Sequence, residues 1–186
     1  MEPFFSTLLA VFLAEIGDKT QLLTLFLAAK FRNKWAVIGG IVTATTINHL
    51  ASAYIGVLAG SLMSDQVVAW VAGVSFIVVG MWLLVPDNAD ENQSRWLTLG
   101  AFAATTILFF IAEIGDKTQI ATTLLAARFE SVWIVASASV LGLLLANVPV
   151  IYFGEALMRR VPQRIVRIAA CSLFCTIGIL SIATHL

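Results

Sequence analysis

The chain has 186 residues, of which 60% are hydrophobic and 12% are charged, and its mean hydropathy is +0.95. Soluble domains carry about 25% charged residues, so this composition excludes an ordinary soluble domain and predicts an integral membrane protein. The formal net charge is zero and the basic residues are dispersed in loops, which gives no indication of nucleic-acid binding. The loops are too short for a second domain, so we expect one transmembrane domain over residues 1–186.

Six apolar segments are each long enough to cross a bilayer as a helix. They cover residues 3–29, 35–60, 67–85, 97–127, 132–157 and 165–184. A polar, turn-rich stretch at about 87–96 separates the third segment from the fourth and marks the boundary between two halves. We therefore predict an all-α integral membrane fold with six transmembrane helices, in which repeat 1 covers about 1–86 and repeat 2 about 97–186.

The heptapeptide Glu-Ile-Gly-Asp-Lys-Thr-Gln occurs twice, at residues 15–21 and at residues 113–119. Each copy lies inside a long apolar segment and is expected near the membrane midplane. Ionisable groups at that depth cost at least a few kcal/mol each, and they typically mark an ion, proton or substrate path. We interpret the two motifs as the centre of the functional site.

A shift of 98 residues relates the two halves beyond the motifs, without a gap. In the third segments, Ala72, Phe76 and Gly80 recur 98 positions later at i, i+4, i+8 spacing, which predicts a shared packing face. Three spans per half is an odd number, so the second half must enter the membrane from the opposite side. The sequence therefore predicts two inverted three-helix repeats, an arrangement common among secondary transporters.

The loop charges predict the orientation of the chain in the membrane. Basic residues in the loops between spans 1 and 2, 3 and 4, and 5 and 6 total eight, whereas the other side has only Arg128. The eight are Lys30, Arg32, Lys34, Arg95, Arg159, Arg160, Arg164 and Arg167. Positively charged loops favour the cytoplasm, so we expect the N- and C-termini outside it.

The carboxylates of the two motifs are the candidate metal ligands. They belong to Glu15, Asp18, Glu113 and Asp116. On a continuous helix, Glu15, Asp18 and Lys19 would share one face. Four ionised carboxylates with the counter-charges Lys19 and Lys117 leave a charge of minus two, which one divalent cation or two protons would neutralise. This favours electroneutral exchange of one metal ion for two protons. The alternative is a buried structural ion-pair network between residues four apart.

Further oxygen and nitrogen atoms are candidate additional ligands or second-layer groups. They belong to Thr20, Gln21, Asn48, His49, Thr118, Gln119 and Asn147. Hard oxygen ligands suit Mg²⁺, Ca²⁺ and Mn²⁺, and a nitrogen from His49 would favour manganese. His49 corresponds to Asn147 in the 98-residue register, and a helix–helix hydrogen bond is an equally good interpretation of that polar position. Gly17 and Gly115 either permit close helix contact or break their helices.

The paired Glu-x-Gly-Asp-Lys-Thr motifs, in the first helices of two three-helix repeats, resemble a family of small membrane transporters in the cation/Ca²⁺ exchanger superfamily. Its eukaryotic members are Golgi Ca²⁺/Mn²⁺:H⁺ transporters, and its short bacterial members are manganese exporters. The resemblance covers essentially the whole chain. It implies six helices, cation–proton antiport and metal coordination by the four carboxylates.

From the residues and the resemblance together we expect a transporter of the cell (inner) membrane that exports Mn²⁺ in exchange for H⁺. Ca²⁺/H⁺ exchange through the same site is the alternative. A cation channel and an intramembrane metal-dependent enzyme are distant alternatives, because the sequence has no His-Glu-x-x-His motif, nucleophile elbow or Gly-rich phosphate loop. The expected partners are Mn²⁺ or Ca²⁺, H⁺ and the lipid bilayer, with no cofactor, no catalytic residues and no nucleic acid.

Overall fold

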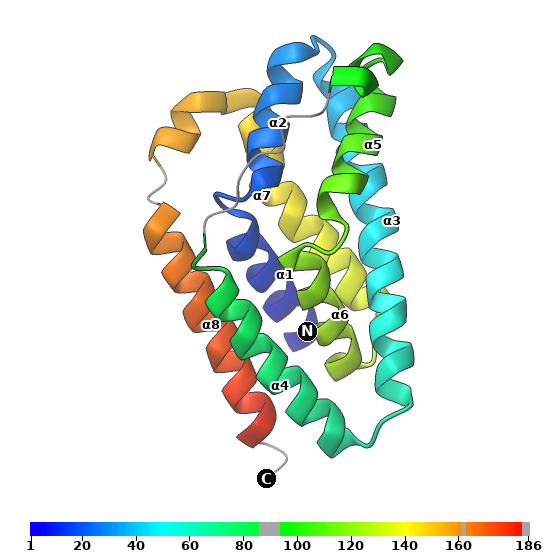
Figure 1. Cartoon of the computed structure of the whole chain (residues 1–186), viewed down its shortest axis with the longest axis vertical. Coiled ribbons are helices and arrows are strands. Elements are labelled where there is room, and N and C mark those ends of the chain that lie inside the picture. The colour runs from blue at the N-terminus through cyan, green and yellow to red at the C-terminus, as the bar shows by residue number, and fades with distance from the viewer. Residues whose placement is uncertain (86–93, 161–162, 184–186) are drawn as a thin grey trace.

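The computed structural model describes residues 1–85, 94–160 and 163–183, and every regular element in these ranges is a helix (Figure 1). In chain order the elements are α1 (Glu2–Glu15), α2 (Lys19–Lys30), α3 (Lys34–Ser61), α4 (Asp65–Trp82), the 3-10 helix η1 (Ser94–Leu99), α5 (Ala101–Glu113), α6 (Lys117–Phe129), α7 (Val132–Arg160) and α8 (Gln163–Ala183). The predicted all-α fold is confirmed.

The helix boundaries follow the 98-residue register. Helices α2, α3 and α4 start 98 positions before α6, α7 and α8, and α1 ends 98 positions before α5. In Figure 1, α1 lies below α2 whereas α5 lies above α6, so the two motif-bearing segments run in opposite directions. This arrangement agrees with inverted repeats, while the orientation of the halves across a membrane stays a prediction.

Three of the six expected segments are not single helices. The segment 3–29 is broken between α1 and α2, and the segment 97–127 is broken between α5 and α6. In the segment 132–157, α7 is kinked at Gly154, whose backbone is not helical (φ +47°, ψ −132°). The fourth segment also starts differently, because residues 97–99 belong to η1 and α5 begins at Ala101. Of the expected linker at 87–96, the last three residues also lie in η1 and the remainder falls outside the described residues.

Two helices in the described ranges are by themselves long and apolar enough to cross a membrane. They are α3, with 28 residues, and the part of α7 from Val132 to Gly154, with 23 residues. Helices α1 and α2 have 14 and 12 residues. At 1.5 Å per residue they are about 21 and 18 Å long, so only the two together match a hydrocarbon core of about 30 Å.

The helices of one half pack on those of the other. Helix α3 contacts α5 and α6, and α7 contacts α1 and α2. At these crossings a Cβ on Gly40 would lie 2.6 Å from the Cβ of Thr105, and a Cβ on Gly142 would lie 2.7 Å from the carbonyl oxygen of Leu8. Glycine therefore lets the paired backbones approach closely. As a result, each motif is held against helices from the opposite half.

The predicted packing face of the third segments is confirmed. Helix α4 packs along α8, and the rings of Phe76 and Phe174 meet edge to face with centroids 5.9 Å apart. Ala72 and Ala170 are buried beside them. A Cβ on Gly80 would contact the Phe174 side chain at 3.1 Å. This pair of helices lies along one side of the molecule (Figure 1).

Candidate metal centre

Each motif is a break between two half-helices. Helix α1 ends at Glu15, Ile16 is extended, Gly17 has a φ of +80°, and Asp18 is the N-cap of α2. A side chain with a Cβ adopts positive φ only at a cost, so glycine at this position permits the chain to turn. Of the two roles considered for this glycine, the structure shows a helix break. The continuous helix face expected for Glu15, Asp18 and Lys19 is therefore wrong.

The second motif repeats this geometry. Gly115 has a φ of +71°, and Asp116 caps α6, accepting hydrogen bonds from the backbone N–H of Thr118 at 3.3 Å and from its hydroxyl at 3.2 Å. The glutamines stabilise both turns, because Gln21 Oε1 accepts the N–H of Gly17 at 2.8 Å and Gln119 Oε1 accepts that of Gly115 at 2.6 Å. The glutamine oxygens thus hold the backbone of the break.

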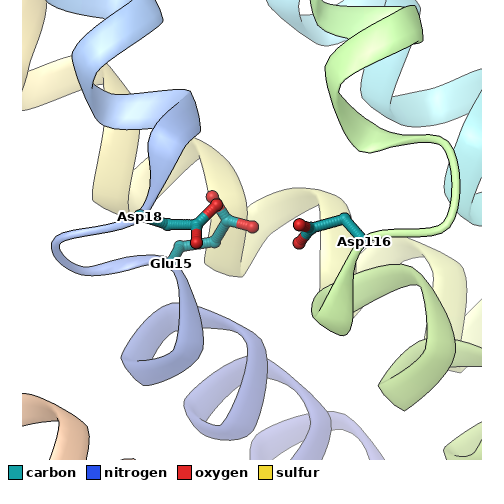
Figure 2. Close-up of side chains that lie close together, drawn as sticks. All are labelled: Glu15, Asp18 and Asp116. Atoms are coloured by element: carbon teal, nitrogen blue, oxygen red, sulfur yellow. The ribbon is translucent and has the colours of Figure 1, made fainter. Parts of the chain in front are cut away.

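Three of the four predicted carboxylates converge. Glu15, Asp18 and Asp116 each offer an oxygen atom, and these three oxygens all lie within 4.8 Å of one another (Figure 2). All three residues are buried. Oxygen ligands lie about 2.3–2.6 Å from Ca²⁺, so two ligands on opposite sides of one ion are about 5 Å apart. The three oxygens can therefore surround a single divalent cation.

Glu15 is oriented by both halves of the chain. Its Oε2 accepts hydrogen bonds from the Thr20 hydroxyl at 2.5 Å and from Asn147 Nδ2 at 3.4 Å. Asn147 is in turn fixed by the Thr24 hydroxyl, which donates to its Oδ1 at 2.8 Å. The other oxygen of Glu15, Oε1, is buried and has no hydrogen-bond partner among the described residues. A buried carboxylate oxygen in that position is suited to receive a cation.

Glu113 lies outside this group of three. Its Oε2 accepts a hydrogen bond from Asn48 Nδ2 at 3.2 Å, and Asn48 also donates to the Phe110 carbonyl at 3.1 Å. Within the described ranges, its Oε1 is likewise buried without a hydrogen-bond partner. Glu15 and Glu113 are thus each held by an asparagine of the opposite half.

His49 forms part of a separate hydroxyl cluster. Its Nδ1 lies 2.9 Å from Thr122 Oγ1, which lies 2.9 Å from Ser139 Oγ and donates to the Thr118 carbonyl at 2.8 Å. The second ring nitrogen, Nε2, is buried and finds no hydrogen-bond partner in the part of the chain that the structure describes. The helix–helix hydrogen bond considered for His49 is therefore present, and Nε2 remains available to a ligand.

The lysines form salt bridges between the motifs rather than within them. Lys19 Nζ lies 3.2 Å from Asp116 Oδ1, and Lys117 Nζ lies 3.9 Å from Asp18 Oδ1. The alternative considered from the sequence was a network of ion pairs between residues four apart in the chain. These two salt bridges instead join residues of different motifs. We call these two contacts the crosswise ion pairs, since each joins one repeat to the other.

The break between α1 and α2 is covered by the α4–α8 pair. A small cavity there is lined by Gly17, Asp18 and Lys117 together with Leu83 and Ala170. At the equivalent break between α5 and α6, Ile114 is 57% exposed. The two breaks therefore have similar backbones in different surroundings.

Sequence reasoning missed five residues that contact the site. They are Thr24, Thr122 and Ser139 in the hydroxyl contacts, and Trp82 and Val85 beside Lys117. The recurrence of Thr24 at Thr122, four residues after the motif threonines, was a usable signal. Trp82 and Val85 gave none, because the 98-residue register places Leu180 and Ala183 at their equivalents.

Comparison with known proteins identifies the family. The model of the divalent cation/proton antiporter GDT1 family matches residues 3–91 and 101–186, which is nearly the whole chain. The chain belongs to the GDT1 family. It is therefore a transporter of the divalent cation/proton antiporter type, a membrane protein and not an enzyme.

Relatives of the GDT1 chain come from bacteria and plants. A Vibrio cholerae protein named "Putative manganese exporter" is 43% identical, over 88% of this chain and 82% of its own length. A GDT1-like protein of Synechocystis is 25% identical, over 96% of this chain and 95% of its own length. GDT1-like protein 5 of Arabidopsis thaliana is 25% identical, over 99% of this chain and 96% of its own length. No solved structure matches.

Proposed function

We propose that this GDT1 protein exports Mn²⁺ from the cytoplasm across the cell (inner) membrane in exchange for protons. Six spans, arranged as two inverted three-helix repeats, would carry the site at their interface. The broken α1–α2 and α5–α6 segments would each count as one span, and both chain termini would lie outside the cytoplasm. The family supports cation–proton exchange, and the name of the Vibrio cholerae relative supports manganese.

The convergence of Glu15, Asp18 and Asp116 carries the proposal. Their oxygens come from both motifs and are buried within 4.8 Å of one another. A cation held between two repeats is bound by both at once, so a relative movement of the repeats changes its coordination. Secondary transporters commonly place their substrate at such a repeat interface, between discontinuous helices.

Glu113 and His49 are proposed to complete the site. Each has one buried polar atom without a hydrogen-bond partner among the described residues, namely Oε1 and Nε2. With four carboxylates and two lysines, binding of one divalent ion or of two protons would neutralise the site. We therefore propose a ratio of one Mn²⁺ to two H⁺.

Ca²⁺/H⁺ exchange is the second candidate. The three converging groups supply oxygen ligands alone, and Ca²⁺ accepts six to eight oxygens in flexible geometry. Participation of His49 Nε2 would favour Mn²⁺, because imidazole is a better ligand for transition metals than for Ca²⁺. The variant His49→Gln separates the two: it should lower Mn²⁺ transport more than Ca²⁺ transport if His49 is a ligand.

The decisive experiment uses purified protein in liposomes that contain a metal-sensitive dye and a pH-sensitive dye. Mn²⁺ and Ca²⁺ are supplied separately, with and without an imposed proton gradient, and Glu2→Gln, which alters an exposed carboxylate, is the matched control. Saturable Mn²⁺ movement with two counter-moving protons, and slower Ca²⁺ movement, is the expected result. Ion movement that is independent of the proton gradient would contradict antiport and favour a channel.

The proposed orientation needs its own test. Alkaline phosphatase fused after Leu186 is active only outside the cytoplasm, so a bacterial cell expressing the fusion should show high activity. A fusion in the loop between α2 and α3 should show low activity. The reverse pattern would contradict export from the cytoplasm with this arrangement of termini.

A further inference from the structure

Each motif lysine lies next to an oxygen of an aspartate in the candidate cation site. Lys19 Nζ is 3.2 Å from Asp116 Oδ1, while the other oxygen of that carboxylate already accepts two hydrogen bonds from Thr118. A divalent ion bound at Oδ1 would lie next to the ammonium group. Like charges at such distances repel strongly in a buried site, so the metal and Lys19 compete for this oxygen.

Lys117 has a second set of contacts near its aspartate. Its Nζ is 3.9 Å from Asp18 Oδ1, 3.4 Å from the carbonyl oxygen of Val85 and 5.7 Å from the centre of the Trp82 ring. A carbonyl oxygen and an aromatic face both attract a cation. The end of α4 therefore offers Lys117 a place to move when it leaves Asp18, without exposing its charge to an apolar environment.

The surroundings of the two lysines differ. The side chain of Lys117 is 4% exposed, and that of Lys19 is 26% exposed. Lys19 can therefore leave Asp116 toward a more accessible region, whereas Lys117 would stay within the protein.

We propose that Lys19 and Lys117 are tethered cations that compete with the transported metal for Asp116 and Asp18. Metal entry displaces the ammonium groups, and their return to the aspartates expels the metal and keeps the empty site compact. The lysines thus set the affinity low enough for release. This inference rests on the proposed function, since it assumes that the carboxylates bind the transported cation.

A purely structural role for the crosswise ion pairs makes a different prediction. If the lysines only join the repeats, their removal loosens the site and weakens metal binding or leaves it unchanged. If they compete with the metal, removing one positive charge tightens metal binding and slows release. Equilibrium affinity and maximal turnover must therefore change in opposite senses.

The test measures equilibrium Mn²⁺ binding to the purified full-length protein by calorimetry, and transport by the same variants in liposomes. Lys19→Gln should lower the Kd for Mn²⁺ about tenfold, which is about 1.4 kcal/mol, and should reduce the maximal transport rate. Lys19→Arg keeps the charge and should retain a Kd close to that of the unaltered protein. An unchanged or higher Kd for Lys19→Gln would overturn the inference.

A second measurement uses the unaltered protein and does not depend on folding of a variant. Acetylation of Lys19 by an amine-reactive ester, followed by mass spectrometry, should increase when Mn²⁺ is added, because the ammonium group leaves Asp116. Labelling that is unchanged or decreased at saturating Mn²⁺ would overturn the inference. Absence of Mn²⁺ binding by the unaltered protein would instead show that the proposed function is wrong, and the inference with it.

Discussion

Asn147 of α7 donates a hydrogen bond to Glu15 at the end of α1, with 3.4 Å between Nδ2 and Oε2. The two residues are 132 positions apart in the chain. Asn48 of α3 makes a similar contact from the other half, to Glu113 at 3.2 Å, although it lies one position before the residue that corresponds to Asn147. Each motif glutamate is thus oriented by an amide of the opposite repeat, and the contact of Asn147 can be tested directly.

Asn147→Ala should weaken cation binding while the protein remains folded. The substitution removes the contact to Glu15 and leaves the Thr24 hydroxyl without its acceptor. A hydrogen bond to a charged group contributes about 1.5–3 kcal/mol, so we expect the KM for Mn²⁺ to rise about tenfold or more. The measurement is initial transport rate against Mn²⁺ concentration in liposomes. Ser137→Ala, an exposed hydroxyl on the same helix that bonds to Ile134, is the control and should keep its KM.

Asp116→Asn should abolish transport and leave the protein inserted in the membrane. The amide has nearly the volume of the carboxylate but lacks the charge that a divalent ion requires, and it cannot pair with Lys19. Metal flux in liposomes and recovery in the membrane fraction are measured together. Glu130→Gln, at the exposed C-terminal end of the same helix, should transport normally. Normal flux through Asp116→Asn would rule out the shared site; Asp18→Asn should behave in the same way.

Gly115→Ala should destabilise the protein through its backbone alone. The φ of +71° is unfavourable for alanine by roughly 1–2 kcal/mol, while an added Cβ would meet no atom within 4 Å. Thermal unfolding in detergent should therefore show a lower Tm. Gly39→Ala is the matched comparison, because its Cβ would make ordinary contacts with Phe102 at 3.5 Å within helix α3. Alanine should stabilise that helix by about 0.5–1 kcal/mol, so the two substitutions should shift Tm in opposite directions.

Gly178→Ala should separate α4 from α8. A Cβ at this position would lie 2.5 Å from the carbonyl oxygen of Gly73, which is backbone and cannot rotate away. Overpacking of this kind costs about 1–3 kcal/mol, so we expect a lower yield of folded protein in size-exclusion chromatography. Thr176→Ala removes an exposed side chain from the same helix and should elute like the unaltered protein. Normal elution of Gly178→Ala would show that the two helices can move apart freely.

Much of this architecture could be predicted because the chain is an internal duplication, so that many of its sequence patterns occur once in each half. The 98-residue register, the apolar segments and the packing of Phe76 on Phe174 are all readable from the pattern of residues. Four carboxylates were predicted as a group, and the oxygens of Glu15, Asp18 and Asp116 converge whereas Glu113 lies outside their cluster. Residue type and depth in an apolar segment were sufficient for these predictions.

The helix breaks and the direction of the ion pairs were not decided by the sequence. A glycine within an apolar run is compatible with close packing or with positive φ, and the sequence does not distinguish the two. In the structure Gly17 has a φ of +80° and donates its N–H to Gln21. Helical spacing placed Lys19 next to Glu15, whereas the break turns it toward Asp116 of the other motif. Such contacts depend on how the two halves approach each other, which a local pattern does not contain.

The packing of α1 and α2 on α7 also has a consequence for how the protein is made. Ribosomes add about 5–20 residues per second, so residue 147 emerges several seconds after Glu15 has been delivered to the membrane. During that interval the first motif has neither Asn147 nor Asp116 as a partner. During biogenesis the first half must therefore remain in the membrane until the second half has been inserted. In that interval its buried charges either lack their partners or are shielded by other molecules.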